Sequence, residues 1–394
     1  MDAQAPRTPP ARGFSQSEFE ARTAKAQELM KQHALGALLV TTEPEVRYYS
    51  GFHTLFWLSP ARPWFLVIPA SGKPIAVIPE IGRNSMSDTW ITDIRTWPAP
   101  QPEDDGISLL VETLKEVVGP HGKIGVPMGH ETHIRMPGAD FDVLRERLEG
   151  VEFVDATPIV RSQRMIKSSA EIDKIAYVCS LASDSFVDLP NLIGTGDSER
   201  QAFTKFRIDL LQRGADDVPY LVGSSGPGGF GDVIKQPSDR ILSEGDMLLF
   251  DTGAVFDGYY CDFDRNYAFG HATDEMKRAY VAVYDATEAG LAAVRPGVKT
   301  SDLWAAMAKV LADNGSQGND VGRLGHGLGM QLTEWPSHTQ NDHTVIEEGM
   351  VLTLEPGMNF GPGLTMLHEE NLVVRGDGPE LLSTRAEPEL PIIC

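Results

Sequence analysis

The chain has 394 residues and a formal net charge of −22, with 56 acidic residues against 34 basic ones. At roughly 100–200 residues per domain, this length predicts two or three domains. The excess of acid argues against nucleic acid and anionic membranes as partners, because both require clustered lysine and arginine. No stretch approaches the ~18–20 continuous apolar residues of a membrane span, so no membrane partner is expected.

The N-terminal residues 1–14 carry prolines but no apolar periodicity and no hydrophobic signal region. We therefore expect a disordered arm over 1–14 and no secretory leader. The three cysteines, Cys179, Cys261 and Cys394, are far apart and odd in number, which predicts neither a disulfide framework nor a paired-cysteine metal site. A reducing, cytoplasmic location is the expectation.

Strands alternate with helices over residues 15–157, a pattern typical of a small α/β domain. Hydrophobic periodicity and turn residues define the individual elements. The expected helices cover 17–33, 107–118 and 141–148, and the expected strands cover 37–41, 64–69, 73–78, 124–126 and 151–154.

The pattern changes over residues 158–394 to longer helices and strands joined by hairpin turns, which favours an α+β domain. Two residue pairs have the spacing of a helix capping box: Ser168 with Glu171, and Ser198 with Gln201. The helices that they begin are expected to end at Pro190 and Gly214. Further helices are expected over 274–294 and 300–313, and strands over 218–223, 247–255, 259–269, 350–355 and 365–374.

Four acidic residues lie on strands, where a carboxylate is uncommon and costly to bury without a partner. Asp251 ends an apolar run, and Asp262 lies in the next strand of the same expected hairpin. Glu355 and Glu369 repeat this arrangement in a second hairpin-like element, and His326 lies between glycines. Each residue alone is ordinarily a turn or loop residue. Together, four carboxylates and one imidazole suit two divalent cations that share bridging carboxylates.

These residues also match a known family, because the chain resembles the pita-bread metallopeptidases of the M24 type. This family includes methionine aminopeptidase, aminopeptidase P, prolidase and the related creatinase. The motifs that carry the resemblance are Asp251-Thr252-Gly253, Gly258-Tyr259 with Asp262 and Arg265, Gly325-His326-Gly327, Glu355-Pro356-Gly357, and Glu369. The resemblance implies a pita-bread catalytic domain over 158–394, preceded by a smaller creatinase-like N-terminal domain over 15–157.

The resemblance further implies a role for each ligand. Asp251 would bind one metal, His326 and Glu355 would bind the other, and Asp262 and Glu369 would bridge both. Because all five ligands are present, a metalloenzyme is favoured over the metal-free creatinase branch. The two ions would be manganese, cobalt, zinc or iron, among which this donor set does not choose. The resemblance also implies a homodimer.

Three positions depart from the peptidase pattern. Ile234 and Thr333 stand where the family's peptidases carry histidines that hold the substrate carbonyl, and Leu367 replaces an arginine. DMSP lyase, within the same family, also departs from this pattern and has a Glu-Trp-Pro string like the one that begins here at Glu334. Glu334 is the candidate proton shuttle and His338 a second catalytic candidate. For both residues an exposed loop position is the alternative.

The leading hypothesis is a dinuclear-metal hydrolase that cleaves an amide-type C–N bond in a small substrate such as an Xaa-Pro dipeptide. A metal-bridging hydroxide would attack the carbonyl. The alternative is a metal-assisted lyase of the DMSP-lyase type, which would remove a proton α to the carboxylate of a small substrate. The absent histidines motivate this alternative. A non-catalytic binding module is disfavoured because the five ligands are intact.

Overall fold

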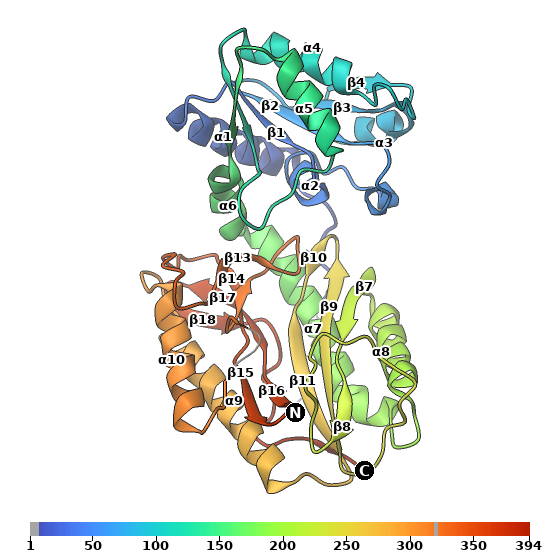
Figure 1. Cartoon of the computed structure of the whole chain (residues 1–394), viewed down its shortest axis with the longest axis vertical. Coiled ribbons are helices and arrows are strands. Elements are labelled where there is room, and N and C mark those ends of the chain that lie inside the picture. Colours follow the sequence, from blue (N-terminus) through green and yellow to red (C-terminus); the bar gives the residue numbers. More distant parts are fainter. Residues whose placement is uncertain (1–7, 319–321) are drawn as a thin grey trace. The chain divides into compact units, whose positions relative to one another are not determined.

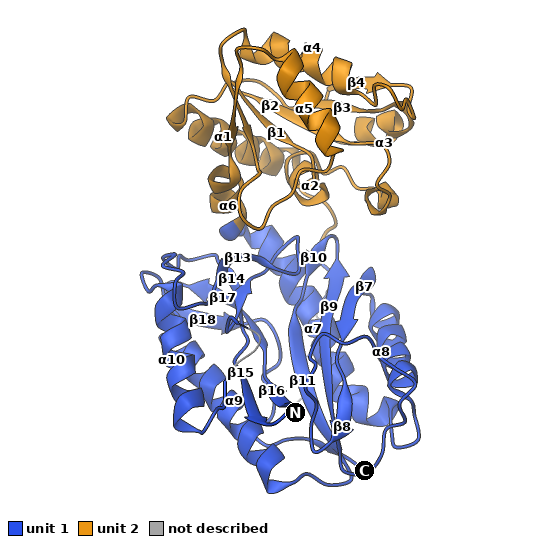
Figure 2. Cartoon of the chain, viewed as in Figure 1, with its two compact units in different colours: residues 1–10, 165–394 blue, residues 11–164 orange. Residues whose placement is uncertain are grey.

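The computed structural model describes residues 8–318 and 322–394, and the chain divides into two compact units (Figures 1 and 2). The N-terminal unit is Ala11–Arg164, and the C-terminal unit is Met165–Cys394 with the described residues 8–10. The division falls at the end of α6, whereas the sequence pattern predicted the change of domain between residues 157 and 158. Of the predicted arm over 1–14, residues 1–7 lie outside the described residues, and residues 8–14 form no helix or strand.

The N-terminal unit is built on a six-stranded mixed sheet with the strand order β4-β3-β2-β1-β5-β6. Its strands are β1 (Ala37–Val40), β2 (Phe65–Pro69), β3 (Ile75–Pro79), β4 (Asp93–Trp97), β5 (Lys123–Val126) and β6 (Glu152–Asp155). Its helices are α1 (Gln16–Gln32), α2 (Glu43–Ser50), η1 (Leu55–Leu58), η2 (Glu80–Gly82), α3 (Arg83–Ser87), α4 (Ile107–Val118), α5 (Gly138–Arg147) and α6 (Thr157–Met165). Leu110 and Leu114 of α4 pack against buried sheet residues such as Leu39 and Val67, which agrees with the α/β prediction.

The C-terminal unit contains two larger sheets and a two-stranded hairpin. The first sheet has the order β10-β9-β11-β19, with β7 and β8 also paired to β9, and the second has the order β13-β12-β14-β17-β18. The strands are β7 (Asp217–Val222), β8 (Ser225–Pro227), β9 (Asp246–Phe256), β10 (Tyr259–Tyr260), β11 (Phe263–Phe269), β12 (His326–Gly327), β13 (Glu334–Ser337), β14 (Val351–Leu354), β15 (Gly357–Gly361), β16 (Leu364–Leu367), β17 (Glu370–Arg375), β18 (Gly378–Leu381) and β19 (Ile392–Ile393).

Four helices pack against these sheets: α7 (Ser169–Leu192), α8 (Glu199–Arg213), α9 (Asp274–Ala293) and α10 (Thr300–Asp313). Helices α7 and α8 contact the sheet of β7 and β9, whereas α9 contacts β14 and the β15–β16 hairpin and packs on α10 (Figure 1). Val283, Met307, Leu352 and Leu372 belong to the core between α9, α10 and the second sheet. No helix among the described residues is both long and apolar enough to cross a membrane.

The two predicted capping boxes are present, but the end of α7 differs from the prediction. Ser168 accepts a hydrogen bond from the Glu171 amide, and the Glu171 side chain accepts one from the Ser168 amide. Ser198 and Gln201 repeat this exchange at the start of α8. Pro190 lies inside α7, which continues to Leu192. A proline in the last turn removes a single backbone hydrogen bond there, and this loss does not stop the helix at Pro190 itself.

Two predicted strands are interrupted where acidic residues occur. The strand expected over 259–269 separates into β10 and β11, with Asp262 between them. The strand expected over 365–374 separates into β16 and β17, with Glu369 between them. Asp251, in contrast, lies inside β9 and does not end a strand. Asp262 and Glu369, two of the four predicted carboxylates, therefore lie on irregular backbone between strands. Strand pairing does not fix the direction of their side chains there.

Candidate metal centre

Strands β9 and β11 place several acidic side chains together. Their antiparallel register sets Asp251 directly opposite Asp264, and Asp262 immediately precedes β11. Residues that lie opposite each other in such a pair project from the same face of the sheet. The Tyr220 hydroxyl of β7 donates a hydrogen bond to Asp251 Oδ2 at 3.2 Å. One face of this sheet thus carries adjacent carboxylates.

Asn371 of β17 fixes the backbone of Asp262. The Asp262 amide donates to Asn371 Oδ1 at 2.9 Å, and Asn371 Nδ2 donates to the Asp262 carbonyl. The side-chain amide therefore pairs with both backbone groups of Asp262, as a neighbouring strand would. Because Asn371 lies two residues after Glu369, these two hydrogen bonds hold Asp262 beside the segment that carries Glu369.

The second sheet contributes the imidazole. His326 begins β12, and its amide donates to Thr353 Oγ1 at 3.2 Å. His326 Nδ1 donates to the Gly327 carbonyl at 2.8 Å, which leaves the lone pair on Nε2. A hydrogen bond of this kind on one ring nitrogen orients the other toward a metal. Glu355 directly follows β14, the partner strand of β12.

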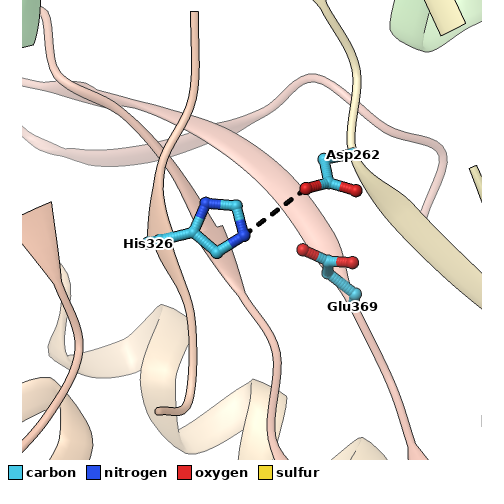
Figure 3. A group of neighbouring side chains, drawn as sticks. All are labelled: Asp262, His326 and Glu369. Atoms are coloured by element: carbon cyan, nitrogen blue, oxygen red, sulfur yellow. Dashed lines mark ion pairs between the residues drawn. The ribbon is translucent and has the colours of Figure 1, made fainter. Parts of the chain in front are cut away.

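Asp262, His326 and Glu369 converge on one point (Figure 3). Each offers one ligand atom, and the three atoms lie within 4.8 Å of one another in a buried setting. His326 Nε2 is 3.4 Å from Asp262 Oδ2 and 4.0 Å from Glu355 Oε2. The structure therefore gathers three of the predicted ligands, with Glu355 beside His326 and Asp251 on the adjoining strand.

The carboxylates strongly perturb one another. Burial, followed by the charges of Asp262 and Glu355, raises the pKa of Asp251 well above its usual range. Burial likewise raises the pKa values of Asp262 and Glu369, and it raises the pKa of Glu355 to about 7. The positive charge of Arg323 opposes this increase at Asp262 and Glu355. Without a cation, the group retains protons that a metal would displace.

The donor atoms fit divalent cations. Asp251 Oδ1 and Glu369 Oε1 are buried and have no hydrogen-bond partner. Buried carboxylate oxygens in proteins are normally paired, hydrogen-bonded or bound to metal. Carboxylate oxygens with a single neutral imidazole form a donor set that first-row divalent cations accept.

Glu334 occupies a different environment from the one expected. Its carboxylate accepts hydrogen bonds from the Met330 amide at 2.8 Å and the Gln331 amide at 3.2 Å, and it pairs with Lys167 Nζ at 3.1 Å. Both charged side chains are 2% exposed, so the loop alternative is wrong for Glu334. The Met330 and Gln331 amides and the Lys167 ammonium stabilise the ionised form of this carboxylate. A carboxylate held by these contacts is better suited to anchoring β13 than to transferring protons.

His338 is also buried, and the exposed loop alternative is wrong here too. Its Cδ2 lies close to Gly325, next to His326, and neither ring nitrogen completes a hydrogen bond. Burial lowers the pKa of His338 to about 3. The ring is thus a neutral packing group beside the loop that carries His326.

The three positions that depart from the peptidase pattern differ in environment. Arg323 Nη2 donates to Thr333 Oγ1 at 3.0 Å. The Arg323 guanidinium therefore lies beside Thr333, one of the two positions where the family's peptidases carry a histidine. Ile234 is 70% exposed, whereas Leu367 is buried in the core. Sequence reasoning missed Arg323, although its position three residues before His326 was a usable signal.

Comparisons with known proteins agree with this architecture. Residues 173–376 match Metallopeptidase family M24, and residues 22–166 match the Creatinase/Prolidase N-terminal domain. A protein named Probable dipeptidase PepE from Mycobacterium tuberculosis is 27% identical over 365 residues, covering 92% of this chain and 94% of the relative. The Xaa-Pro dipeptidase of Pyrococcus horikoshii is 24% identical over 373 residues, covering 94% and 98%.

Structural similarity extends over both units. The crystal structure of dipeptidase PepE from Mycobacterium ulcerans has a TM-score of 0.85 and 29% sequence identity, and the match covers 97% of this chain and 100% of that one. These similarities confirm the predicted α+β pita-bread fold with a creatinase-like N-terminal domain. All three of these relatives are named as dipeptidases, and they give no support to the lyase alternative.

Proposed function

This chain belongs to metallopeptidase family M24 and is a metal-dependent hydrolase, and we propose that it hydrolyses a small dipeptide of the Xaa-Pro type. The observation that carries the proposal is the convergence of Asp262, His326 and Glu369, with Asp251 and Glu355 beside them. Two divalent cations, of manganese, cobalt, zinc or iron, would be held by these five residues. The names of the relatives support a dipeptide as the substrate class.

Several hydrogen bonds within the chain would orient the metal ligands of that centre. Bound divalent cations would supply an activated water and polarise the scissile carbonyl. The hydrogen bonds of His326 Nδ1 and Tyr220 fix the orientation of the imidazole and of Asp251. The Asn371 amide fixes Asp262. These contacts position the donors before a substrate arrives, and such positioning lowers the reorganisation needed during the reaction.

Arg323 is suited to stabilising negative charge on the substrate. The site has no histidine at Thr333, but the Arg323 guanidinium is held there by its hydrogen bond to Thr333. Its positive charge lowers the pKa values of Asp262 and Glu355, which supports a role for Arg323 at this centre. A fixed cation at this point would stabilise the oxyanion that develops on the attacked carbonyl. Glu334 and His338 are assigned to positioning, the former through Lys167.

The proposal is tested by metal analysis of the purified full chain together with hydrolysis of a panel of Xaa-Pro dipeptides. We expect bound divalent cation and release of free proline. Asp262→Ala should lose at least one ion and most of the turnover, whereas Asp377→Ala, at an exposed position, should behave as wild type. A wild-type protein without metal, or an Asp262→Ala variant with unchanged turnover, would overturn the proposal.

The same panel separates hydrolysis from elimination. Sulfonio- and betaine-type carboxylates are included as substrates, and products are identified by mass spectrometry. An alkene acid would indicate a lyase, whereas two products that together contain the elements of one added water indicate a hydrolase. The homodimer that the family resemblance implies is part of the proposal, and sedimentation equilibrium of the full chain tests it.

A further inference from the structure

We propose that Asp264 is an additional metal-binding carboxylate of this centre, beyond the five ligands named above. The inference rests on the proposed function, because it requires that the site hold divalent cations. It concerns a residue whose position in β11 gave no signal in the sequence. Its support comes from strand register, burial and an unpartnered oxygen.

Strand register directs Asp264 toward the centre. Asp264 lies directly opposite Asp251 in the β9–β11 pair, and opposite residues project from the same face of the sheet. Side chains alternate along a strand, so the neighbour Arg265 projects from the other face. Arg265 Nη2 pairs with Glu370 Oε2 at 3.0 Å, away from Asp264's carboxylate, in agreement with that alternation.

The carboxylate of Asp264 is buried without a complete set of partners. Asp264 is 2% exposed, and its Oδ1 has no hydrogen-bond partner. Glu369 Oε1, in a residue that is 1% exposed, and the buried Oδ1 of the half-buried Asp251 also have no hydrogen-bond partner. Three unpartnered carboxylate oxygens within one group of neighbouring acids form a donor set that a divalent cation would satisfy, since buried charges are otherwise paired.

Electrostatic neighbours place Asp264 within the same group. The negative charges of Asp251, Glu355 and Glu370 act on Asp264, the positive charge of Arg265 acts on it in the opposite sense, and the charge of Asp264 acts on Glu369. The nearby cation Arg265 donates to the backbone carbonyls of Asp264 and Glu369 in addition to its ion pair with Glu370. None of these contacts is a hydrogen bond from Arg265 to the Asp264 carboxylate, so Arg265 acts on Asp264 through its charge and does not occupy Oδ1.

A fifth carboxylate changes the charge balance of the centre. Four carboxylates would balance the four positive charges of two divalent cations, whereas five leave one negative charge in excess. An added oxygen donor of this kind strengthens the binding of hard, oxygen-preferring cations such as Mn²⁺. Asp264 should therefore increase cation affinity at this centre.

The experiment measures cation affinity without reference to turnover. The full chain is stripped with a chelator and titrated with Mn²⁺ by calorimetry, as wild type and as Asp264→Asn. We expect binding weaker by at least about 10- to 100-fold, because altering even an outer-shell partner of a metal ligand has an effect of this size. Asp246→Asn is the matched control, because Asp246 is 1% exposed and on β9 but pairs with Arg240. Its affinity should equal that of wild type.

The outcomes separate this inference from the proposed function. Equal Mn²⁺ affinity in wild type and Asp264→Asn would overturn the role of Asp264 and leave the proposed function intact. Absence of binding by wild type of Mn²⁺, Co²⁺, Zn²⁺ and Fe²⁺ alike would overturn both. Circular dichroism of each stripped protein establishes folding before titration, and Asp264→Ser, smaller and neutral, replaces the asparagine variant if that variant does not fold.

Discussion

Lys167 and Glu334 are two residues whose side chains are each only 2% exposed, and they neutralise each other at 3.1 Å. Removing one member of such a pair leaves an uncompensated buried charge, which typically costs 3–5 kcal/mol. We therefore expect Lys167→Met to lower the free energy of unfolding by about 3–5 kcal/mol. Urea denaturation of the full chain measures the change.

A solvent-exposed pair provides the control for that measurement. Lys205 contacts Asp197 at 2.8 Å, but its side chain is 44% exposed. Lys205→Met should cost about 1 kcal/mol or less, as is usual for exposed ion pairs. If Lys167→Met and Lys205→Met lower the free energy of unfolding by similar amounts, then the burial of Glu334 does not determine how much the Lys167–Glu334 pair contributes to stability.

The buried ring of His338 makes the free energy of unfolding depend on pH. Burial lowers its pKa to about 3, below the value of about 6.5 for an unfolded histidine. The unfolded chain therefore binds more protons between these values, and the contribution of His338 to stability is lost as pH falls from about 6.5 toward 3. At pH 5 the loss amounts to about 2 kcal/mol relative to pH 7.5, at about 1.4 kcal/mol per pH unit.

Unfolding of the metal-free chain by urea at pH 7.5 and at pH 5 tests this dependence. His338→Gln should reduce the difference between the two pH values by about 2 kcal/mol. His271→Gln, at an exposed position, should leave it unchanged. An unchanged difference in His338→Gln would show that the buried ring does not control the acid response.

At the scale of elements, the short strand β12 depends on close backbone contact. A Cβ added at Gly327 would lie 2.0 Å from the Trp335 carbonyl oxygen of β13. Gly327→Ala should therefore separate β12 from β13, displace His326 and weaken Mn²⁺ binding by at least about tenfold, as for other altered supporting groups. Calorimetric titration of the stripped protein checks this expectation.

Gly194→Ala is the matched control for the β12 variant. No atom lies within 4 Å of a Cβ placed at Gly194, and its φ is not positive. This variant should bind Mn²⁺ as wild type does. If Gly327→Ala also binds normally, the close approach of β12 and β13 does not determine the position of His326.

Sequence patterns predicted the long elements well and the irregular ones poorly. Helix α4 coincides with its expected range of 107–118, and both capping boxes form, because these signals act within a few residues. The two-residue strand β12 was missed, since it forms only through pairing with distant strands. The break at Asp262 was missed for the same reason, because Asn371, 109 residues away, replaces the strand partner.

The candidate site shows the same limit. The five acidic and imidazole residues were identifiable from their type and from the motif order, and the structure brings Asp262, His326 and Glu369 together. Asp264 could be assigned to the site only from the register of β9 and β11. The burial of Glu334 could not be predicted either, because its ion-pair partner Lys167 is 167 residues distant in the chain.

At the scale of the whole molecule, all the proposed metal ligands lie in the C-terminal unit. A ligand that binds only the folded state stabilises that state by mass action. Adding Mn²⁺ should therefore raise the melting temperature of the C-terminal unit and leave the transition of the N-terminal unit unchanged. Differential scanning calorimetry of the full chain, with and without chelator, checks this expectation.

Asp262→Ala supplies the control for the calorimetric experiment. This variant should show a smaller shift on addition of Mn²⁺ than wild type does, because a bridging ligand is missing and at least one ion is lost. A shift of both transitions in wild type would contradict the confinement of metal binding to the C-terminal unit.

The two hydrogen bonds between the Asn371 side chain and the Asp262 backbone have a consequence for the metal-free protein. The amide joins the segment before β11 to β17 with neutral hydrogen bonds, so this junction does not depend on an ion. The donors then remain in place when a cation departs, and a replacement can enter a site that is already assembled. We expect metal exchange to be fast and repeatable, limited by the escape of the ion and not by refolding of the chain.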